Sequence, residues 1–479
     1  MILKDILLEK FNSGEAEGLG IKRICELFSA KSREEKNSVI EAVYELQKEG
    51  RIVYDNGRFI LLENSKFLKG TLKGNERGFA FVITETAGDF FIPPRCLNGA
   101  LNGDTVIIER QVSSRGSTDE AIVRQILKRG TTKIVGTFDG EKGYGFVIPD
   151  DRNFSVDVYI PKSKTMGAKP FDKVVALITD YPEKSRNPEG KIIEIIGKKN
   201  DLHAEELSII KAFDLPLEFP EKVERELDRI PTEVYEEEKL TRTDFTKDLV
   251  VTIDGEDSRD FDDAVSVKKT KTGYTLSVHI ADVSHYVFLN SAIGKEAYER
   301  ATSVYFPERV IPMLPKKLSN GICSLNEGVD RLTLSLVMDI DKQGEVKSFD
   351  LVKGVIRSKK RMTYTAVQSV IDGVIPKDYQ EFVPLIKDMY SLSKILRNKR
   401  SERGNIDLTV EESHVYVDEK NNIVVEPRKS IDAYKIIEEF MILANETVAE
   451  TFSAKNIPFV YRVHDTPSEE KTLSFMQFI

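Results

Sequence analysis

Four aspartates stand close together in one short stretch of the chain: Asp254, Asp260, Asp262 and Asp263. They follow an apolar run typical of a β-strand, and a second such run begins at Ala264, so we expect them in a loop between strands or at the strand ends. Carboxylates this close raise one another's pKa and oppose folding unless a cation lies among them. Because the stretch contains no histidine or cysteine, its donor set favours a hard divalent cation, Mg²⁺ or Mn²⁺.

Clustered aspartates also occur in calcium-binding EF-hand loops and in solvated acidic loops. A calcium-binding EF-hand loop requires glycine at its sixth position and glutamate at its twelfth, and the residues from Asp260 onward have neither. A solvated acidic loop stays open, although the apolar strands around the aspartates make it the weaker interpretation. Paired Mg²⁺ ions about 3.5–4 Å apart can activate water and stabilise the departing oxygen of a phosphodiester. The cluster therefore predicts phosphodiester hydrolysis if the chain also binds nucleic acid.

The length of 479 residues predicts about three domains. The chain has no apolar run of the roughly 20 residues that a membrane span needs, and its first residues mix both charges and lack a signal-cleavage site. We therefore expect a cytoplasmic protein without membrane contact, working as a monomer. Its three cysteines, Cys25, Cys96 and Cys323, form no CxxC pair, which excludes an evident zinc finger and makes a disulfide framework unexpected.

The formal net charge of −9 argues against binding polyanions over the whole surface, but local charge decides recognition. One basic run lies between Lys353 and Arg361, and another between Lys394 and Arg403 at helical spacing. Each run is either a solvated face or a nucleic-acid contact, and the pattern leaves the two alternatives balanced.

Residues 1–64 show two amphipathic helical patterns and then two short apolar runs around Asp55, Asn56 and Gly57. An Asn-Gly pair between apolar runs is typical of a β-hairpin. Helices followed by a hairpin predict a winged helix-turn-helix, a fold that binds nucleic acid or serves as a protein-contact module.

An internal repeat predicts two small β-barrels, at residues 65–130 and 131–200. The motifs GFAFV and DFFIP at 78–82 and 89–93 return in order as GYGFV and DVYIP at 143–147 and 157–161. Alternation places aromatic rings on one strand face, where bases can stack with little sequence preference. One ring of each pair could instead line the barrel core, but the duplication favours nucleic-acid binding. The expected RNA-binding side chains are Phe79, Phe81, Tyr144, Phe146 and Tyr159.

Residues 201–247 are rich in acid and helix formers and predict a helical connector, and residues 248–479 predict a mixed α/β domain. The expected fold class is multidomain α+β: a winged helix-turn-helix, two barrels that resemble OB-fold cold-shock domains, and a mixed α/β domain that the resemblance described next implies is an incomplete catalytic domain. The barrel motifs resemble the short RNA-binding motifs of cold-shock domains. The stretches at 249–267, 278–287, 303–307, 312–315, 318–321, 323–326 and 329–331 resemble, in order, the ribonuclease II and ribonuclease R family.

This resemblance implies a processive, hydrolytic exoribonuclease that degrades single-stranded and structured RNA from its 3′ end to nucleoside 5′-monophosphates. It assigns metal ligation and catalysis to the four aspartates, with Asp262 central. It also implies that Tyr305 stacks on the RNA near the cleavage point, that Tyr364 lies near the terminal ribose and that Glu439 recognises the 2′-hydroxyl. Where a second stacking aromatic is expected, the chain has Leu408. Contacts with the ribosome or the RNA-decay machinery remain open.

The sequence ends shortly after Tyr461-Arg462-Val463-His464-Asp465, a segment that resembles the middle of the family's catalytic domain. We therefore expect a truncated domain that lacks the family's later arginine-rich segment, which supplies a guanidinium to the substrate phosphate. The alternative function for these residues is an RNA-binding protein without turnover. His279 and His285 could suggest a general base, but alternation with apolar neighbours favours a structural role for His279.

Overall fold

The computed structural model describes residues 3–111, 119–141, 144–181, 186–307, 309–405, 412–419, 422–428 and 430–478. The chain divides into two units, Met1–Leu215 and Pro216–Ile479. Leu408, at the expected place of a second stacking aromatic, lies outside the described residues. Within the described ranges, no helix is both long and apolar enough to cross a bilayer.

The first unit begins with three helices and a hairpin. They are α1 (Leu3–Asn12), α2 (Ile21–Leu27), α3 (Arg33–Lys48), β1 (Ile52–Asp55) and β2 (Arg58–Leu61). Ser32 and Glu35 begin α3 with a reciprocal capping box, which satisfies backbone N–H groups at the helix start. Asn56 and Gly57 both have positive φ, as the tight hairpin turn requires.

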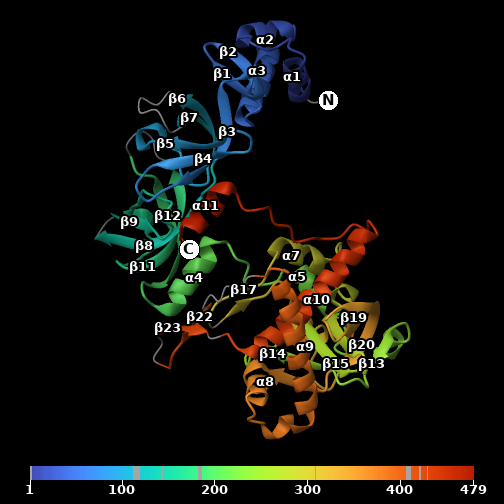
Figure 1. Ribbon diagram of the computed structural model, residues 1–479. Coiled ribbons are helices and arrows are strands. Elements are labelled where there is room, and N and C mark those ends of the chain that lie inside the picture. Colours follow the sequence, from blue (N-terminus) through green and yellow to red (C-terminus); the bar gives the residue numbers. More distant parts are fainter. Residues whose placement is uncertain are drawn as a thin grey trace. The chain divides into compact units, whose positions relative to one another are not determined.

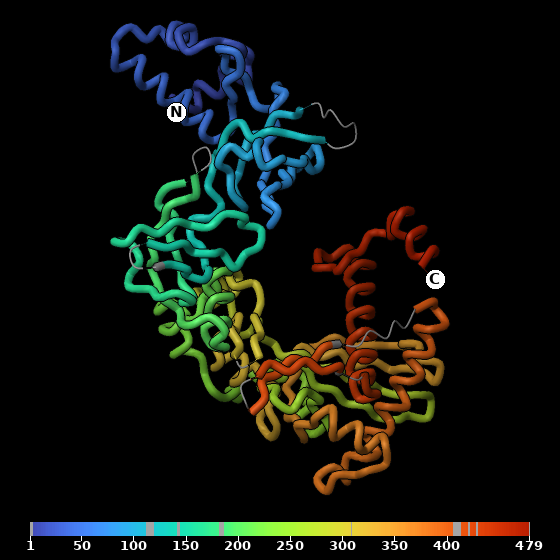
Figure 2. Tube along the Cα trace, turned by 90° about the vertical axis from the view of Figure 1, so that its left-hand side faces the viewer, coloured from blue at the N-terminus to red at the C-terminus, as the bar shows by residue number. Residues whose placement is uncertain are grey.

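Two closed β-barrels follow, as the internal repeat predicted. The first contains β3 (Phe67–Gly74), β4 (Ala80–Thr84), β5 (Gly88–Ile92), β6 (Thr105–Gln111) and β7 (Glu120–Lys128). The second contains β8 (Lys133–Glu141), β9 (Tyr144–Pro149), β10 (Val158–Pro161), β11 (Asp172–Asp180) and β12 (Glu189–Lys198). Their strand orders, β3-β4-β5-β7-β6 and β8-β9-β10-β12-β11, are equivalent around the closed rings. The helices and the two barrels follow one another in chain order (Figure 2).

The segment expected as a single connector is divided between the units. Helix α4 (Leu202–Ala212) packs on the second barrel, where the buried Lys173 forms ion pairs with Asp150 and Glu205. The second unit receives α5 (Glu221–Leu227), α6 (Glu236–Lys239) and β13 (Thr243–Phe245). Val223 and Leu227 of α5 lie in an apolar cluster with Ile293.

The second unit is built on a 7-stranded sheet with the order β13-β20-β19-β16-β15-β14-β21. Its further strands are β14 (Val251–Asp254), β15 (Asp263–Lys269), β16 (Gly273–Ala281), β19 (Asp330–Asp341), β20 (Val346–Arg357) and β21 (Lys360–Thr363). Strand β14 pairs antiparallel with β15 and parallel with β21. The two carboxylate-bearing strands are therefore neighbours near one edge of the sheet.

Helices pack on one face of this sheet and form the main core. They are α8 (Tyr364–Ile371), α9 (Val383–Glu402) and α10 (Asp432–Ala454), drawn in orange and red-orange beside β14 and β15 (Figure 1). The remaining elements are α7 (Ala292–Arg300), β17 (Val304–Tyr305), β18 (Val310–Ile311), β22 (Glu412–Val417), β23 (Ile423–Arg428) and α11 (Glu469–Phe478). The face formed by Val251, Val265 and Leu276 packs with Phe440 in one apolar cluster.

Candidate functional site

The four aspartates lie on one loop and the two strand ends that it joins. Asp254 ends β14 and Asp263 begins β15, while Asp260 and Asp262 belong to the loop. Phe261, between the last two, is only 4 % exposed and packs in an apolar cluster. A buried aromatic flanked by two carboxylates thus anchors the loop from inside.

Ser324 fixes the same loop through its hydroxyl. Its Oγ accepts a hydrogen bond from the Phe261 N–H at 3.0 Å and donates one to the Arg259 carbonyl at 3.0 Å. The next N–H, of Leu325, donates to the Phe261 carbonyl at 2.9 Å. Arg331 in turn donates from Nε to the Ser324 carbonyl at 2.9 Å. These bonds hold both sides of Phe261 in place.

Arg361, on β21, holds the first half of the loop. Its Nη2 donates to the carbonyl oxygens of Gly255 and Ser258, at 3.2 and 3.4 Å, and also to that of Glu256. The guanidinium carbon lies 5.4 Å from the centroid of the Phe261 ring. Three backbone carbonyl oxygens of the acidic loop therefore accept hydrogen bonds from the guanidinium group of Arg361.

The electrostatics of the loop are those of crowded carboxylates. Burial, followed by the charges of Asp260 and Asp262, raises the pKa of Asp254 to about 6, while Arg361 opposes that rise. Burial and the charges of Asp254 and Asp262 raise the pKa of Asp263 to about 6 as well. Asp262 is exposed by area, yet neighbouring atoms desolvate its carboxylate and, with Asp260, raise its pKa. The predicted mutual repulsion is therefore present.

The donor chemistry of this cluster fits Mg²⁺ or Mn²⁺, because all four side chains offer carboxylate oxygens. Among the residues described, no group of three or more His, Cys, Asp or Glu side chains is arranged so that it could hold a metal ion. Mutual repulsion keeps like charges apart, and a bound cation would relieve it. The residues that would hold the metal are Asp254, Asp260, Asp262 and Asp263.

Tyr305 is brought to this cluster by the short β17. Its ring is 67 % exposed, and its hydroxyl donates to Asp260 Oδ2 at 3.4 Å. Partial burial and the charge of Asp260 raise the pKa of this phenol, which therefore stays protonated. Tyr364 begins α8 directly after Thr363, which is paired in register with Asp254. The ring of Tyr364 meets that of Tyr434 at 4.7 Å.

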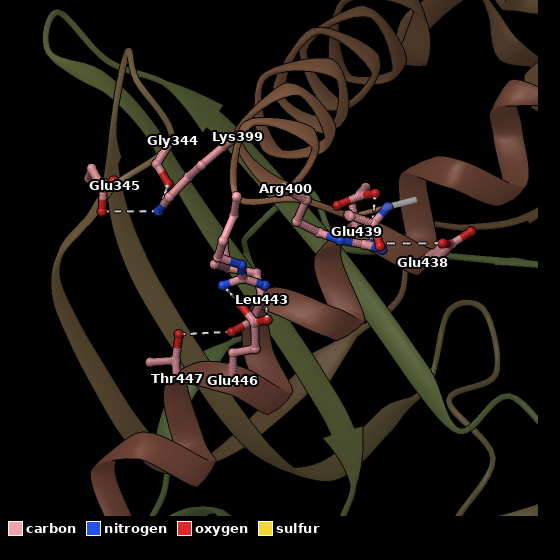
Figure 3. A network of polar contacts seen from close by, with 11 residues as sticks. Gly344, Glu345, Lys399, Arg400, Glu438, Glu439, Leu443, Glu446 and Thr447 are labelled. Carbon is pink, nitrogen blue, oxygen red and sulfur yellow. Dashed lines mark hydrogen bonds and ion pairs between the residues drawn. The ribbon is translucent and has the colours of Figure 1, made fainter. Parts of the chain in front are cut away.

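Glu439 is a buried residue of α10 whose partner, Arg400, belongs to α9. The residue is 3 % exposed, and its Oε1 accepts a hydrogen bond from Arg400 Nη1 at 2.9 Å (Figure 3). Burial raises the pKa of Glu439, and the charge of Arg400 opposes that rise. The structure thus provides a buried acceptor at this position.

The aromatic side chains predicted on the barrels lie together on the outside of each barrel. In the first, the ring centroids of Phe79, Phe81 and Phe91 lie 5.4–5.8 Å apart. Phe90, the neighbour of Phe91, points the other way into the core, as strand alternation requires.

The second barrel repeats this platform with tyrosines. The Tyr159 ring lies 6.1 Å from Tyr144 and 5.6 Å from Phe146. The two platforms differ in charge, because Lys73 is the cross-strand partner of Phe81, whereas Asp139 is the partner of Phe146. The first platform therefore has a basic residue beside it and the second an acidic one.

His279 and His285, the two histidines considered as a general base, are both held by contacts with other side chains. His279 is fully buried, with Nδ1 bonded to Ser335 Oγ at 2.8 Å, and burial lowers its pKa to about 4. His285 Nε2 lies 2.6 Å from Glu238 Oε1. These contacts agree with the structural role expected for His279.

Sequence reasoning missed three residues around the site: Ser324, Arg361 and Arg400. Both arginines belong to the basic runs that left a solvated face and a nucleic-acid contact open, and both instead contact protein oxygens. Ser324 stands within one of the stretches that resemble the family, but nothing in its type indicates a partner 65 residues away. Only the packing of distant segments reveals these contacts.

Comparison with known families assigns residues 242–479 to the RNB domain, 146–220 to the cold shock domain and 70–125 to the ribonuclease B OB domain. Ribonuclease R of Thermotoga maritima is 44% identical over 476 residues, which cover 98% of this chain and 67% of that relative. Ribonuclease R of Escherichia coli K12 is 36% identical over 438 residues, covering 90% of this chain and 54% of that relative.

A solved structure of Mycoplasma genitalium RNase R in complex with ribose methylated single-stranded RNA has a TM-score of 0.80 and 29% sequence identity. The match covers 86% of this chain and 65% of that one. The chain spans 53–67% of the length of the first curated relatives that it matches. With its RNB domain, its two barrels and a relative of this identity and coverage, the chain belongs to the ribonuclease R family.

Proposed function

We propose that this chain acts as a processive 3′–5′ exoribonuclease that hydrolyses RNA to nucleoside 5′-monophosphates with Mg²⁺, or Mn²⁺ in its place. One observation carries the proposal: a single loop and its flanking strand ends gather Asp254, Asp260, Asp262 and Asp263 into mutual electrostatic contact, with Tyr305 bonded to one of them. When bound, the metal supplies Lewis-acid activation of water and neutralises charge at the phosphodiester.

The chain's own residues orient the substrate. The exposed ring of Tyr305 offers a stacking face beside Asp260, which would position the last base next to the scissile phosphate. Tyr364, next to the strand partner of Asp254, would contact the terminal ribose. Glu439 would accept a hydrogen bond from its 2′-hydroxyl, the group that distinguishes RNA from DNA.

RNA is the proposed partner, and the two aromatic platforms would bind its single-stranded segments by stacking on the bases. Solved relatives are described in complex with ribose methylated single-stranded RNA and with double-stranded RNA. The three helices and hairpin at the start of the chain would form a winged helix-turn-helix that adds a further nucleic-acid or protein contact.

The test is a time course on 5′-labelled single-stranded RNA with Mg²⁺, with EDTA and with Asp262→Asn in parallel. The proposal expects stepwise shortening from the 3′ end, release of nucleoside 5′-monophosphates, and loss of both with EDTA or the variant. Asp257→Asn, which changes an aspartate of the same loop outside the four, is the matched control and should retain activity. Shortening that persists in Asp262→Asn would contradict the assignment.

RNA binding without turnover is the competing outcome. It is favoured by the aromatic platforms, which are complete on the two barrels by themselves. Tight binding of the labelled RNA with no shortening at any Mg²⁺ or Mn²⁺ concentration would establish this alternative for the 479 residues.

A further inference from the structure

The two barrels carry opposite charges at one equivalent position beside their aromatic platforms. In the first barrel Lys73 of β3 lies opposite Phe81 of β4, and in the second Asp139 of β8 lies opposite Phe146 of β9 (Figure 1). Phe81 and Phe146 occupy the same place in the repeated motif, as GFAFV and GYGFV show. The two platforms therefore offer different chemistry to a ligand that stacks on them.

The carboxylate of Asp139 lies on the same face as the aromatic rings. Residues directly opposite each other in an antiparallel pair share one face of the sheet, with Cβ atoms about 4.5–5.5 Å apart. Phe138, the neighbour of Asp139, is buried in the barrel core, so strand alternation turns the exposed Asp139 outward. Tyr159 of β10 is the partner of Phe146 on its other side. Asp139, Phe146 and Tyr159 therefore form one row across three strands.

Both oxygens of the Asp139 carboxylate are open to a ligand. The side chain makes no hydrogen bond and no ion pair with another residue that the structure describes. Burial and then the charge of Asp139 raise the pKa of Asp157, which directly precedes β10. A carboxylate in this place repels phosphate groups, but it accepts hydrogen bonds from N–H donors. The row is therefore suited to the edge of a base and not to the backbone of the strand.

The four RNA bases differ in the donors that they present to such a carboxylate. Stacking alone gives little base preference, whereas the Watson–Crick edges of unpaired bases are open to hydrogen bonding. Guanine has two adjacent donors on this edge, the N1–H and the 2-amino group, which match the two oxygens of a carboxylate. Adenine and cytosine place one amino group beside an acceptor nitrogen, and uracil places one N–H between two carbonyl oxygens. An acidic row therefore favours guanine and disfavours uracil most.

We propose that Asp139 is a specificity-determining residue of the second barrel and accepts a pair of hydrogen bonds from a guanine stacked on Phe146 and Tyr159. The inference takes RNA as its ligand from the proposed function, and it goes further by giving the two barrels different tasks. Lys73 has no acceptor for these donors, so the first platform binds RNA without this preference. The second platform holds the strand most tightly where a guanosine is present.

The experiment measures binding in EDTA, so that it does not depend on hydrolysis. Three 5′-fluorescein-labelled oligouridines, identical except for a guanosine, an inosine or a uridine at one internal position, are titrated with the full chain by fluorescence anisotropy. Inosine keeps the N1–H but lacks the 2-amino group. The unmodified chain should bind the guanosine RNA about fivefold more tightly than the uridine RNA, at the lower end of what a bidentate base contact contributes. The affinity for the inosine RNA should lie between the two.

Two substitutions of Asp139 separate base recognition from general repulsion. Asp139→Asn exchanges one acceptor oxygen for a donor and should bring the affinities for the guanosine and uridine RNAs close together. Asp139→Lys gives the second barrel the charge of the first, and it should bind all three RNAs more tightly and without preference. Glu194→Gln is the matched control, because it changes the net charge as Asp139→Asn does but concerns a residue of β12 that pairs with Lys211 of α4 at 2.9 Å. It should keep the guanosine preference.

A uniform gain in affinity for all three RNAs in Asp139→Asn, with the guanosine preference intact, would show that the carboxylate only repels phosphates and would overturn the inference. Equal binding of the guanosine and uridine RNAs by the unmodified chain, or no binding of either, overturns it as well. Shortening of RNA with Mg²⁺ is measured separately and decides the proposed hydrolysis. A guanosine preference that depends on Asp139, in a chain that shortens no RNA, supports the inference and counts against the proposed catalysis alone.

Discussion

Replacing Arg361 with methionine is predicted to loosen the aspartate loop without unfolding the sheet that carries it. The guanidinium is the common donor for the carbonyl oxygens of Gly255, Glu256 and Ser258. Methionine has a similar length but no donor, so the carbonyls would have to turn toward water. The carboxylates on the same backbone would turn with them.

The size of the expected loss in loop stability follows from the number of N–H groups that Arg361 Nη2 can donate. One Nη nitrogen carries two N–H groups, so the three contacts amount to at most two full charge-assisted bonds, each contributing about 1.5–3 kcal/mol. Glu256 is exposed, and water can replace part of that interaction. We expect the free energy of local loop opening to fall by about 2–3 kcal/mol, which corresponds to opening that is about 30- to 150-fold more frequent.

Hydrogen exchange followed by mass spectrometry or NMR can measure this change at two amides. The N–H of Phe261 is bonded to Ser324 Oγ, and the N–H of Leu325 is bonded to the Phe261 carbonyl. Both should exchange faster in Arg361→Met, with Arg361→Lys intermediate because it keeps one charged donor. RNA hydrolysis should slow mainly in kcat, since the RNA-binding platforms are untouched.

Arg357→Met is the matched control. Arg357 is a nearby exposed arginine that pairs with Asp330 at 2.7 Å and makes no contact with the loop among the described residues. It should leave exchange at Phe261 and Leu325 unchanged. Equal acceleration in both variants, or none in Arg361→Met, would refute the role assigned to the guanidinium.

Three further predictions concern other parts of the chain. Tyr305→Ala should lengthen the final undigested fragment on a sequencing gel, whereas Tyr305→Phe, which loses only the hydroxyl bonded to Asp260, should not. Phe81→Ala should weaken binding of single-stranded RNA by about 1–3 kcal/mol, measured by anisotropy, while Ile83→Ala, exposed on the same strand, should change it little. His279 has a pKa of about 4 when folded against a reference of 6.5. Between pH 4 and 6.5 the unfolded chain therefore binds more protons at this histidine than the folded chain does. The free energy of unfolding of the unmodified chain, taken relative to that of His279→Leu, should fall by about 1.4 kcal/mol per pH unit as the pH drops from about 6.5 toward 4. Denaturant titrations in EDTA at pH 7.5 and 5 measure this difference. The same difference in free energy of unfolding at both pH values would mean that the imidazole is already charged in the folded protein, and would contradict the prediction.

Much of the architecture could be predicted from local patterns. The repeated motifs around Phe81 and Phe146 predicted two barrels with outward aromatic faces, because side-chain alternation along a strand is fixed by backbone geometry. The same alternation explains why Phe90 lies in the core. The apolar runs on either side of Asp254 and Asp263 likewise placed the carboxylates at strand ends. Each of these predictions depends on neighbours only a few residues away.

The sequence by itself thus determined the two barrels, the presence of a carboxylate loop and the family to which the chain belongs. Only the tertiary structure decided the roles of the basic side chains. Arg361 and Arg400 stand in runs of similar charge, yet one lies beneath the loop at Gly255 and the other holds Glu439. Charge and spacing are the same whether an arginine meets water, phosphate or a protein carbonyl. The choice is made when strands and helices that are far apart in sequence pack together, because the partner of each guanidinium comes from another element.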